Sequence, residues 1–147
     1  SAPVLDCQAK LGGDGAAGAA FLVNSGNANA FTGRHGTDSV QAITQAVSKA
    51  ASVPKERVFT ASTGVIGEPL PHDRIIEVLN DLSAAQDPAR INDAAKAIMT
   101  TDTFAKGAAT TININGTPVT IAGIAKELTA PKTTLRRDNR EIFIMHL

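Results

Sequence analysis

The 147-residue sequence lacks the features that mark several functional classes. It contains no tryptophan, no tyrosine and no long basic block, and its net charge is +0, so no nucleic-acid partner is predicted. No apolar run is long enough to cross a bilayer, so no membrane partner is predicted either. The single cysteine, Cys7, excludes an internal disulfide framework and favours a reducing compartment. We therefore expect a cytoplasmic protein.

The sequence also lacks the spacings that mark metal sites and several kinds of active site. The three histidines, His35, His72 and His146, do not have the spacing of metal ligands. No zinc, EF-hand or P-loop pattern is present, and the Gly-x-Ser-x-Gly elbow of serine hydrolases is missing. We predict no bound metal.

The residues that are present favour one α/β domain. Hydrophobic residues make up 43% of the chain, which is enough to build a core at this length. Apolar runs at residues 19–23 and 57–62 predict strands. Between them, apolar residues recur every three or four positions, which predicts a helix that starts at Thr37 or Asp38 and runs to about Ala51. The order strand, helix, strand is typical of an α/β layer.

The N-terminal region contains a glycine pattern of low specificity. Residues 1–11 suggest a short extended segment, and Gly13, Gly15 and Gly18 then have the spacing of a dinucleotide-binding fingerprint. That fingerprint needs a strand before it and a helix after it, whereas here the apolar run follows the glycines. We therefore predict a flexible loop and keep a nucleotide-binding module as an alternative.

Two polar stretches lie at expected strand ends. Residues 24–33 contain three asparagines and two glycines, which predicts a shaped loop that does not continue the strand. The loop is either an ordinary turn or a place for ligand groups. Thr63-Gly64 interrupts the second apolar run, and a strand that stops there could point a hydroxyl and a backbone N–H into an oxyanion hole. The alternative is a tight turn.

The second half of the chain carries clearer local patterns. Residues 75–82 predict an amphipathic helix, and Asp87-Pro88 is typical of a helix start with an aspartate N-cap. Residues 110–114 and 117–121 flank Asn115-Gly116, which is a strong indication of a hairpin. The predicted buried stripe of the helix after Asp87 consists of Ile91, Ala94, Ala95, Ile98 and Met99.

A polar cluster and a lysine follow these elements. Thr100-Thr101-Asp102-Thr103 ends the predicted helix, either as capping groups or as a site for a small polar ligand. Lys126 ends the second strand of the hairpin, either as a solvated residue or as a placed cation. Residues 132–140 are basic and precede an apolar run, and we interpret them as a solvated terminal segment with an apolar anchor.

Four stretches together resemble the ornithine acetyltransferases of arginine biosynthesis, the family of glutamate N-acetyltransferases that includes bifunctional arginine biosynthesis proteins. They occur in the order of that family and with similar spacing. The resemblance covers about residues 1–126 and corresponds to the α-chain portion, and residues 127–147 form a divergent tail. The stretches are Val23-Asn24-Ser25-Gly26-Asn27-Ala28-Asn29-Ala30 with Thr32-Gly33, Ala61 to Leu70, Ala97-Ile98-Met99-Thr100-Thr101-Asp102-Thr103, and Ile121-Ala122-Gly123-Ile124-Ala125-Lys126.

The resemblance implies a layered sandwich of sheets and helices, incomplete in this chain, of the type with an N-terminal threonine nucleophile. A precursor cuts itself before that threonine, whose own α-amine then serves as the base. Thr63 and Gly64 take the oxyanion role, and Thr100 and Lys126 take substrate-binding roles. Thr134 lies nearest the nucleophile position, one residue short of the family register.

The implied reaction moves an acetyl group from N-acetylornithine to glutamate through an acetyl-threonine intermediate. It requires a β chain, and the αβ pairs associate further into a heterotetramer. No cofactor is implied, although acetyl-CoA serves some members as a co-substrate. Because only Ala130-Pro131 fits the family's cleavage passage, we also keep the alternative of a non-catalytic fragment or divergent relative with a binding fold only. We expect the isolated chain to be inactive and poorly stable.

Overall fold

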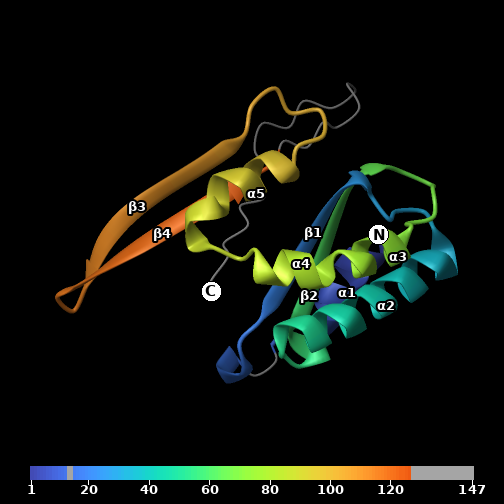
Figure 1. The fold of residues 1–147 in the computed structure, drawn as a ribbon, viewed down its shortest axis with the longest axis horizontal. Coiled ribbons are helices and arrows are strands. Elements are labelled where there is room, and N and C mark those ends of the chain that lie inside the picture. Colours follow the sequence, from blue (N-terminus) through green and yellow to red (C-terminus); the bar gives the residue numbers. More distant parts are fainter. Residues whose placement is uncertain (13–14, 127–147) are drawn as a thin grey trace. The chain divides into compact units, whose positions relative to one another are not determined.

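A computed structural model describes residues 1–12 and 15–126, which divide into two compact units at Gln86 and Asp87 (Figure 1). Helices and strands occur in both units, so the predicted α/β class is confirmed. The predicted tail boundary after residue 126 stays a prediction, because residues 127–147 lie outside the described residues. The first unit contains α1 (Ala2–Lys10), β1 (Ala20–Asn27), α2 (Gly33–Ala51), β2 (Val58–Val65), α3 (His72–Glu77) and α4 (Leu79–Ala84), with 3-10 turns at Gly15–Ala17 and Lys55–Arg57.

The first unit is built on a parallel pair of strands. β1 and β2 run side by side, with Ala20 opposite Val58 at the start of the register. α2 packs against this pair, α1 packs against β2 and α2, and α3 and α4 pack against α2 (Figure 1). The predicted order strand, helix, strand is therefore confirmed. The buried core consists of Leu22, Ile43, Val47, Val58, Leu70 and Leu79.

The opposite face of the β1–β2 pair is also apolar. Because side chains alternate along a strand, Phe21 and Val23 lie on the face opposite Leu22. Phe21 is 46% exposed and Val23 is 43% exposed. The Phe21 ring stacks on that of Phe59, with centroids 5.2 Å apart. This face thus presents large apolar side chains that the helices of the first unit do not cover.

The chain begins with helix α1, so the predicted extended segment at residues 1–11 is wrong. The helix is held by contacts with β2. Cys7 Sγ donates to the carbonyl oxygen of Thr60 at 3.4 Å, and Lys10 Nζ donates to that of Val58 at 3.1 Å. These partners lie 53 and 48 residues further along the chain, where no local pattern reveals them.

Helix α2 begins at Gly33, about one turn before the predicted start at Thr37 or Asp38. The earlier start has a local cause, because the Thr32 hydroxyl donates to Asn29 Oδ1 at 2.8 Å and fixes the chain where it enters the helix. The predicted apolar stripe lies on the core side. Its buried members are Val40, Ile43 and Val47.

Strand β1 continues to Asn27, so the prediction that residue 24 begins a loop is wrong. Asn24 pairs with Ser62, and the Ser62 hydroxyl donates to Asn24 Oδ1 at 2.7 Å, which lets the polar side chain stay within the sheet. The loop starts after the strand, and it contains two residues with positive φ, Asn29 at 44° and Phe31 at 57°.

One predicted helix is divided in two. The sequence predicted a continuous helix over residues 75–82, whereas α3 and α4 are separate six-residue helices. The division falls at Val78, whose ψ of 0° departs from helical geometry. The buried Leu79 then starts α4 and joins the core of the first unit.

The second unit contains a 3-10 turn (Pro88–Arg90), α5 (Ile91–Ala97), β3 (Lys106–Ile114) and β4 (Thr117–Ala125). The predicted aspartate cap is confirmed, since Asp87 Oδ1 accepts from the N–H of Ala89 at 2.8 Å. The predicted hairpin is also confirmed, with β3 and β4 antiparallel around Asn115 and Gly116, both at positive φ. A small core joins α5 to β4 through Ala95, Ile98 and Ile124.

Candidate functional site

Thr63 and Gly64, the predicted oxyanion-hole residues, lie near the end of β2. The sequence predicted that the strand breaks at these residues, and this is wrong, because Thr63 pairs with Ser25 and Gly64 pairs with Gly26. The register becomes irregular at Asn27, immediately after these pairs. Thr63 and Gly64 therefore lie at the carboxyl edge of the parallel pair because the strand pairing ends just after them, and not because the strand breaks at them.

Gly64 sits where no other residue fits without rearrangement. Its φ is 132°, a value that L side chains rarely adopt. A Cβ added at Gly64 would overlap the carbonyl carbon of Gly26 and lie 2.6 Å from the backbone nitrogen of Asn27. Gly64 thus lets the ends of β1 and β2 approach closely, which shapes the backbone around the predicted oxyanion residues.

The asparagines of the predicted loop hold that backbone in place. Asn24 Nδ2 donates to the carbonyl oxygen of Asn27 at 2.9 Å, and Asn27 Nδ2 donates to that of Glu68 at 3.0 Å. Asn29 is fully buried, and its Nδ2 donates to the carbonyl oxygen of Gly36 at 3.1 Å. These three amides connect the loop after β1 to the loop after β2 and to the start of α2. Their role in the described residues is to shape the loops.

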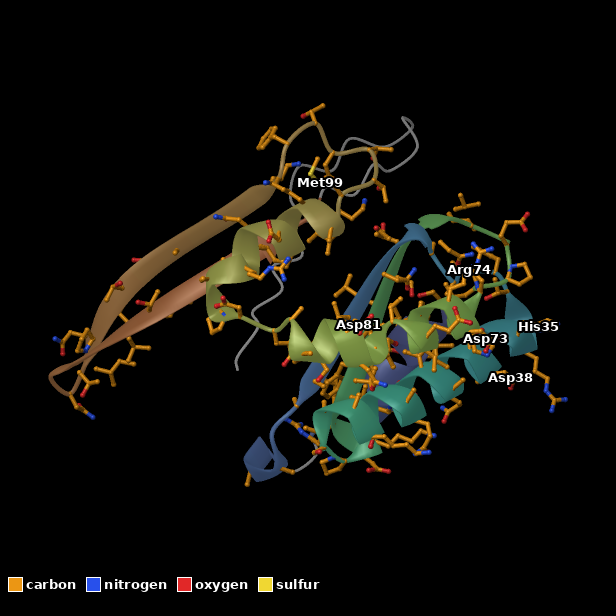
Figure 2. All side chains as sticks on the ribbon, in the orientation of Figure 1. His35, Asp38, Asp73, Arg74, Asp81 and Met99 are labelled. Carbon is orange, nitrogen blue, oxygen red and sulfur yellow. The ribbon has the colours of Figure 1, made fainter. Side chains whose placement is uncertain are left out.

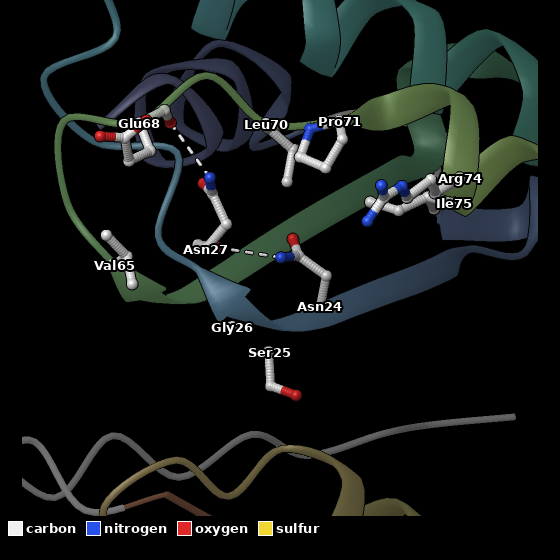
Figure 3. A pocket seen from close by; sticks show the side chains of 10 residues that line it. All are labelled: Asn24, Ser25, Gly26, Asn27, Val65, Glu68, Leu70, Pro71, Arg74 and Ile75. Carbon is white, nitrogen blue, oxygen red and sulfur yellow. Dashed lines mark hydrogen bonds between the residues drawn. The ribbon is translucent and has the colours of Figure 1, made fainter.

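A pocket of about 370 Å³ opens where β1 and β2 end (Figure 3). The carboxyl ends of parallel strands are a common place for ligands in α/β proteins. In Figure 3 the residues from α3, Arg74 and Ile75, face Val65 and Glu68 across the asparagine side chains. Thr63 and Gly64 do not line it. The lining residues are Asn24, Ser25, Gly26, Asn27, Val65, Glu68, Leu70, Pro71, Arg74 and Ile75.

The second unit brings together the two predicted substrate-binding residues. Thr100 lies after α5 and Lys126 lies directly after β4, and both contact Asp102. The N–H of Thr100 donates to Asp102 Oδ2 at 3.3 Å, and Lys126 Nζ lies 3.9 Å from the same oxygen. Lys106 Nζ donates to Asp102 Oδ1 at 3.0 Å and lies 4.6 Å from the centre of the Phe104 ring.

The sequence did not predict the central position of Asp102 or the contribution of Lys106. Asp102 was part of the polar cluster after the predicted helix, but its lysine partners were not identified. The four-residue spacing between Asp102 and Lys106 was the available indication. Thr63 and Gly64 belong to the first unit, and Thr134, the predicted nucleophile position, lies outside the described residues.

The two histidines within the described ranges lie on α2 and α3. His35 lies exposed on α2 near Asp38 (Figure 2), and His72 Nδ1 lies 3.0 Å from the hydroxyl of Ser39. Within residues 1–12 and 15–126, no three histidine, cysteine, aspartate or glutamate side chains are grouped to hold a metal ion. The same ranges contain no helix with the length and apolar character needed to span a membrane.

The glycine pattern at Gly13, Gly15 and Gly18 does not have the surroundings of a dinucleotide site. Helix α1 precedes it and strand β1 follows it, which is the reverse of the order that the fingerprint requires. Gly13 itself lies outside the described residues. The order of these elements gives no support to the nucleotide-binding alternative.

Comparison with known proteins gives one consistent result. The model of the ArgJ family matches residues 1–129. The chain is 64% identical over 126 residues to the arginine biosynthesis bifunctional protein ArgJ of Ruegeria pomeroyi. This alignment covers 86% of the chain and 31% of that relative. It is 51% identical over 125 residues to the protein of the same name from Gluconobacter oxydans, and this alignment covers 85% of the chain and 29% of that relative. The chain thus spans about three-tenths of the length of these curated relatives.

Solved structures give the same result. The arginine biosynthesis bifunctional protein of Bacillus halodurans matches with a TM-score of 0.74 and 29% identity, covering 96% of this chain and 71% of that one. The ornithine acetyltransferase of Mycobacterium tuberculosis, solved in complex with ornithine, matches with a TM-score of 0.72 and 30% identity. That alignment covers 88% of this chain and 68% of the other.

Proposed function

Because the chain belongs to the ArgJ family, we propose that it forms part of an acyltransferase of arginine biosynthesis. The proposed reaction transfers an acetyl group from N2-acetyl-L-ornithine to L-glutamate through an acetyl-threonine intermediate. The observation that carries this proposal is the family match over residues 1–129, together with 64% identity to the Ruegeria pomeroyi relative. The chain acts together with a second chain that supplies the remaining substrate groups.

The first half-reaction splits the acetylated substrate. The hydroxyl oxygen of the nucleophilic threonine attacks the acetyl carbonyl carbon, and its proton passes to the α-amine of the same residue. The developing oxyanion is stabilised by Thr63 and Gly64. The carbon–nitrogen bond then breaks, ornithine leaves with the proton returned to its amine, and the acetyl group stays on the threonine.

The second half-reaction reverses these steps with glutamate. The amine of glutamate attacks the acetyl-threonine carbonyl, the same donors stabilise the oxyanion, and the threonine oxygen leaves and regains its proton. Thr100 and Lys126 bind both substrates in turn. A lysine suits this role because both substrates carry a carboxylate. Acetyl-CoA could replace N-acetylornithine as the donor, and no cofactor takes part.

The layered sandwich is proposed on the same basis. In that fold a second layer covers the open face of the sheet, and this agrees with the half-exposed Phe21 and Val23 on β1. The nucleophile lies near Thr134 and is released by self-cleavage of a precursor. The α and β chains assemble into a heterotetramer in the cytoplasm.

One alternative has an observation in its favour. The chain spans 31% of the Ruegeria pomeroyi relative, and the family match ends at residue 129. A divergent relative can retain the fold and a substrate-binding site without completing the catalytic machinery. In that case it binds N-acetylornithine or glutamate and transfers nothing.

The two possibilities are separated by reconstitution. The chain is combined with the complementary segment of the Ruegeria pomeroyi relative, and ornithine release from N-acetylornithine and glutamate is measured. We expect ornithine release only from the combination, and intact-mass measurement without glutamate should show one added acetyl group. Binding of N-acetylornithine without ornithine release would support the alternative, and absence of both would refute the proposed function.

A further inference from the structure

Asp102 is a buried carboxylate at the centre of the second unit. Its side chain is 1% exposed, whereas that of Lys126 is 16% exposed and that of Lys106 is 26% exposed. A buried carboxylate requires hydrogen bonds and opposite charges to offset its lost hydration. Asp102 receives both, from the Thr100 N–H and from the two ammonium groups.

The three contacts join three separate parts of the unit. Thr100 follows α5, Lys106 begins β3 and Lys126 follows the last residue of β4. One carboxylate therefore fixes the end of the helix against the ends of both strands. Its two oxygens are used differently, since Oδ1 binds Lys106 at 3.0 Å while Oδ2 faces Thr100 at 3.3 Å and Lys126 at 3.9 Å.

The two ammonium groups are held around Asp102 in different ways. Lys106 makes the shorter contact with Asp102, and its ammonium also lies over the Phe104 ring, which anchors it. Lys126 is held at ion-pair distance, so its ammonium is oriented without a short hydrogen bond to Oδ2.

We propose that Asp102 is the positioning residue for carboxylate recognition in this enzyme. It holds the Lys126 ammonium and the Thr100 backbone in the geometry that binds the carboxylate of N-acetylornithine or glutamate, while Lys106 anchors Asp102. This inference rests on the proposed function. Asp102 acts through Lys126 and Thr100 and does not itself touch the reacting atoms.

The placement is tested by NMR on the wild-type chain and on Asp102→Asn, each combined with the complementary segment of the Ruegeria pomeroyi relative. Asparagine keeps the shape but removes the charge, so the Thr100 amide and the Lys126 ammonium signals should both move. Asp93→Asn is the matched control, because Asp93 forms an exposed ion pair with Arg90 in the same unit at 3.1 Å. Unchanged Thr100 and Lys126 signals in Asp102→Asn would overturn the proposal.

The functional consequence is tested in the enzyme reconstituted with its complementary segment. Displacing a positioning group by about 1 Å can cost about 100-fold, so Asp102→Asn should raise KM for both substrates about 10- to 100-fold. kcat should change far less, which is the pattern of lost substrate binding. A role limited to stability would lower the unfolding midpoint and leave KM unchanged, and that result would overturn the proposal.

A third variant covers the case in which Asp102→Asn does not fold. Asp102→Glu keeps the charge and moves it by one methylene group, so it should raise KM by less than Asp102→Asn and retain the fold. A wild-type KM in Asp102→Glu together with unmoved Thr100 and Lys126 signals would overturn the proposal. If the wild-type assembly transfers no acetyl group, the proposed function fails. The Thr100 amide and Lys126 ammonium signals, followed during titration with N-acetylornithine, still decide whether Asp102 positions the site.

Discussion

The close approach of β1 and β2 at Gly64 predicts a large effect of Gly64→Ala. The substitution adds a methyl group at a φ of 132°, where it overlaps the Gly26 carbonyl carbon. The positive φ alone costs roughly 1–2 kcal/mol. Forcing the two backbones apart costs about 1–3 kcal/mol more. The expected loss in the free energy of unfolding is therefore about 2–5 kcal/mol, a large share of the roughly 5–15 kcal/mol typical of a domain.

Gly67→Ala is the matched control for this prediction. Gly67 also has a positive φ, 87°, but a Cβ added there meets no atom within 4 Å. Gly67→Ala should therefore cost only about 1–2 kcal/mol. The difference between the two variants in the free energy of unfolding therefore measures the cost of the steric overlap between the strands.

The assay is urea unfolding followed by far-ultraviolet circular dichroism, since the chain has no tryptophan or tyrosine for fluorescence. With a slope of about 1–3 kcal/mol per molar urea, the Gly64→Ala midpoint should lie about 1 M below that of Gly67→Ala. Equal midpoints would refute the reasoning, because they would mean that the strand ends separate at no cost.

Three further predictions concern single side chains. Thr63→Ala should lower acetyl transfer by about 10²–10³-fold in the reconstituted enzyme without moving the unfolding midpoint, and wild-type ornithine release would contradict the oxyanion role. Ile43→Ala should lower the free energy of unfolding by about 2–5 kcal/mol, because the Ile43 side chain is 2% exposed. Its control is Ile66→Ala, at a residue that is 63% exposed, which should change the free energy of unfolding by less than about 0.5 kcal/mol. Similar urea midpoints for the two variants would contradict this prediction. Asp87→Ala should cost about 1 kcal/mol by removing the bond to the Ala89 N–H, and unchanged urea unfolding would show that the cap is dispensable.

The elements that the sequence predicted well are those set by local chemistry. Asn115-Gly116 accepts positive φ at two successive positions, which suffices to form the hairpin. Asp87 caps its turn through its own side chain, and the stripe on α2 follows from helical periodicity. Each of these patterns lies within a short window of sequence.

The elements that the sequence did not predict depend on distant partners. α1 is held by carbonyl groups of β2, and the polar end of β1 is held by Ser62. Thr63 and Gly64 suggested a strand break because their own residue types are turn-like, while their strand partners lie 38 residues earlier. The role of Asp102 was overlooked for the same reason, since its partner Lys126 follows β4, after the whole hairpin in the sequence.

The β3–β4 hairpin has a mechanical consequence. Each strand has nine residues, which at about 3.3 Å per residue gives an arm of about 30 Å. The packing against α5 involves Ile124 near its base, whereas Ile112 and Ile114 near the tip are 41% and 49% exposed. Amide hydrogen exchange should therefore accelerate steadily from base to tip. A peptide tag or fluorophore inserted between Asn115 and Gly116 would sit at the fastest-exchanging end and leave the base undisturbed.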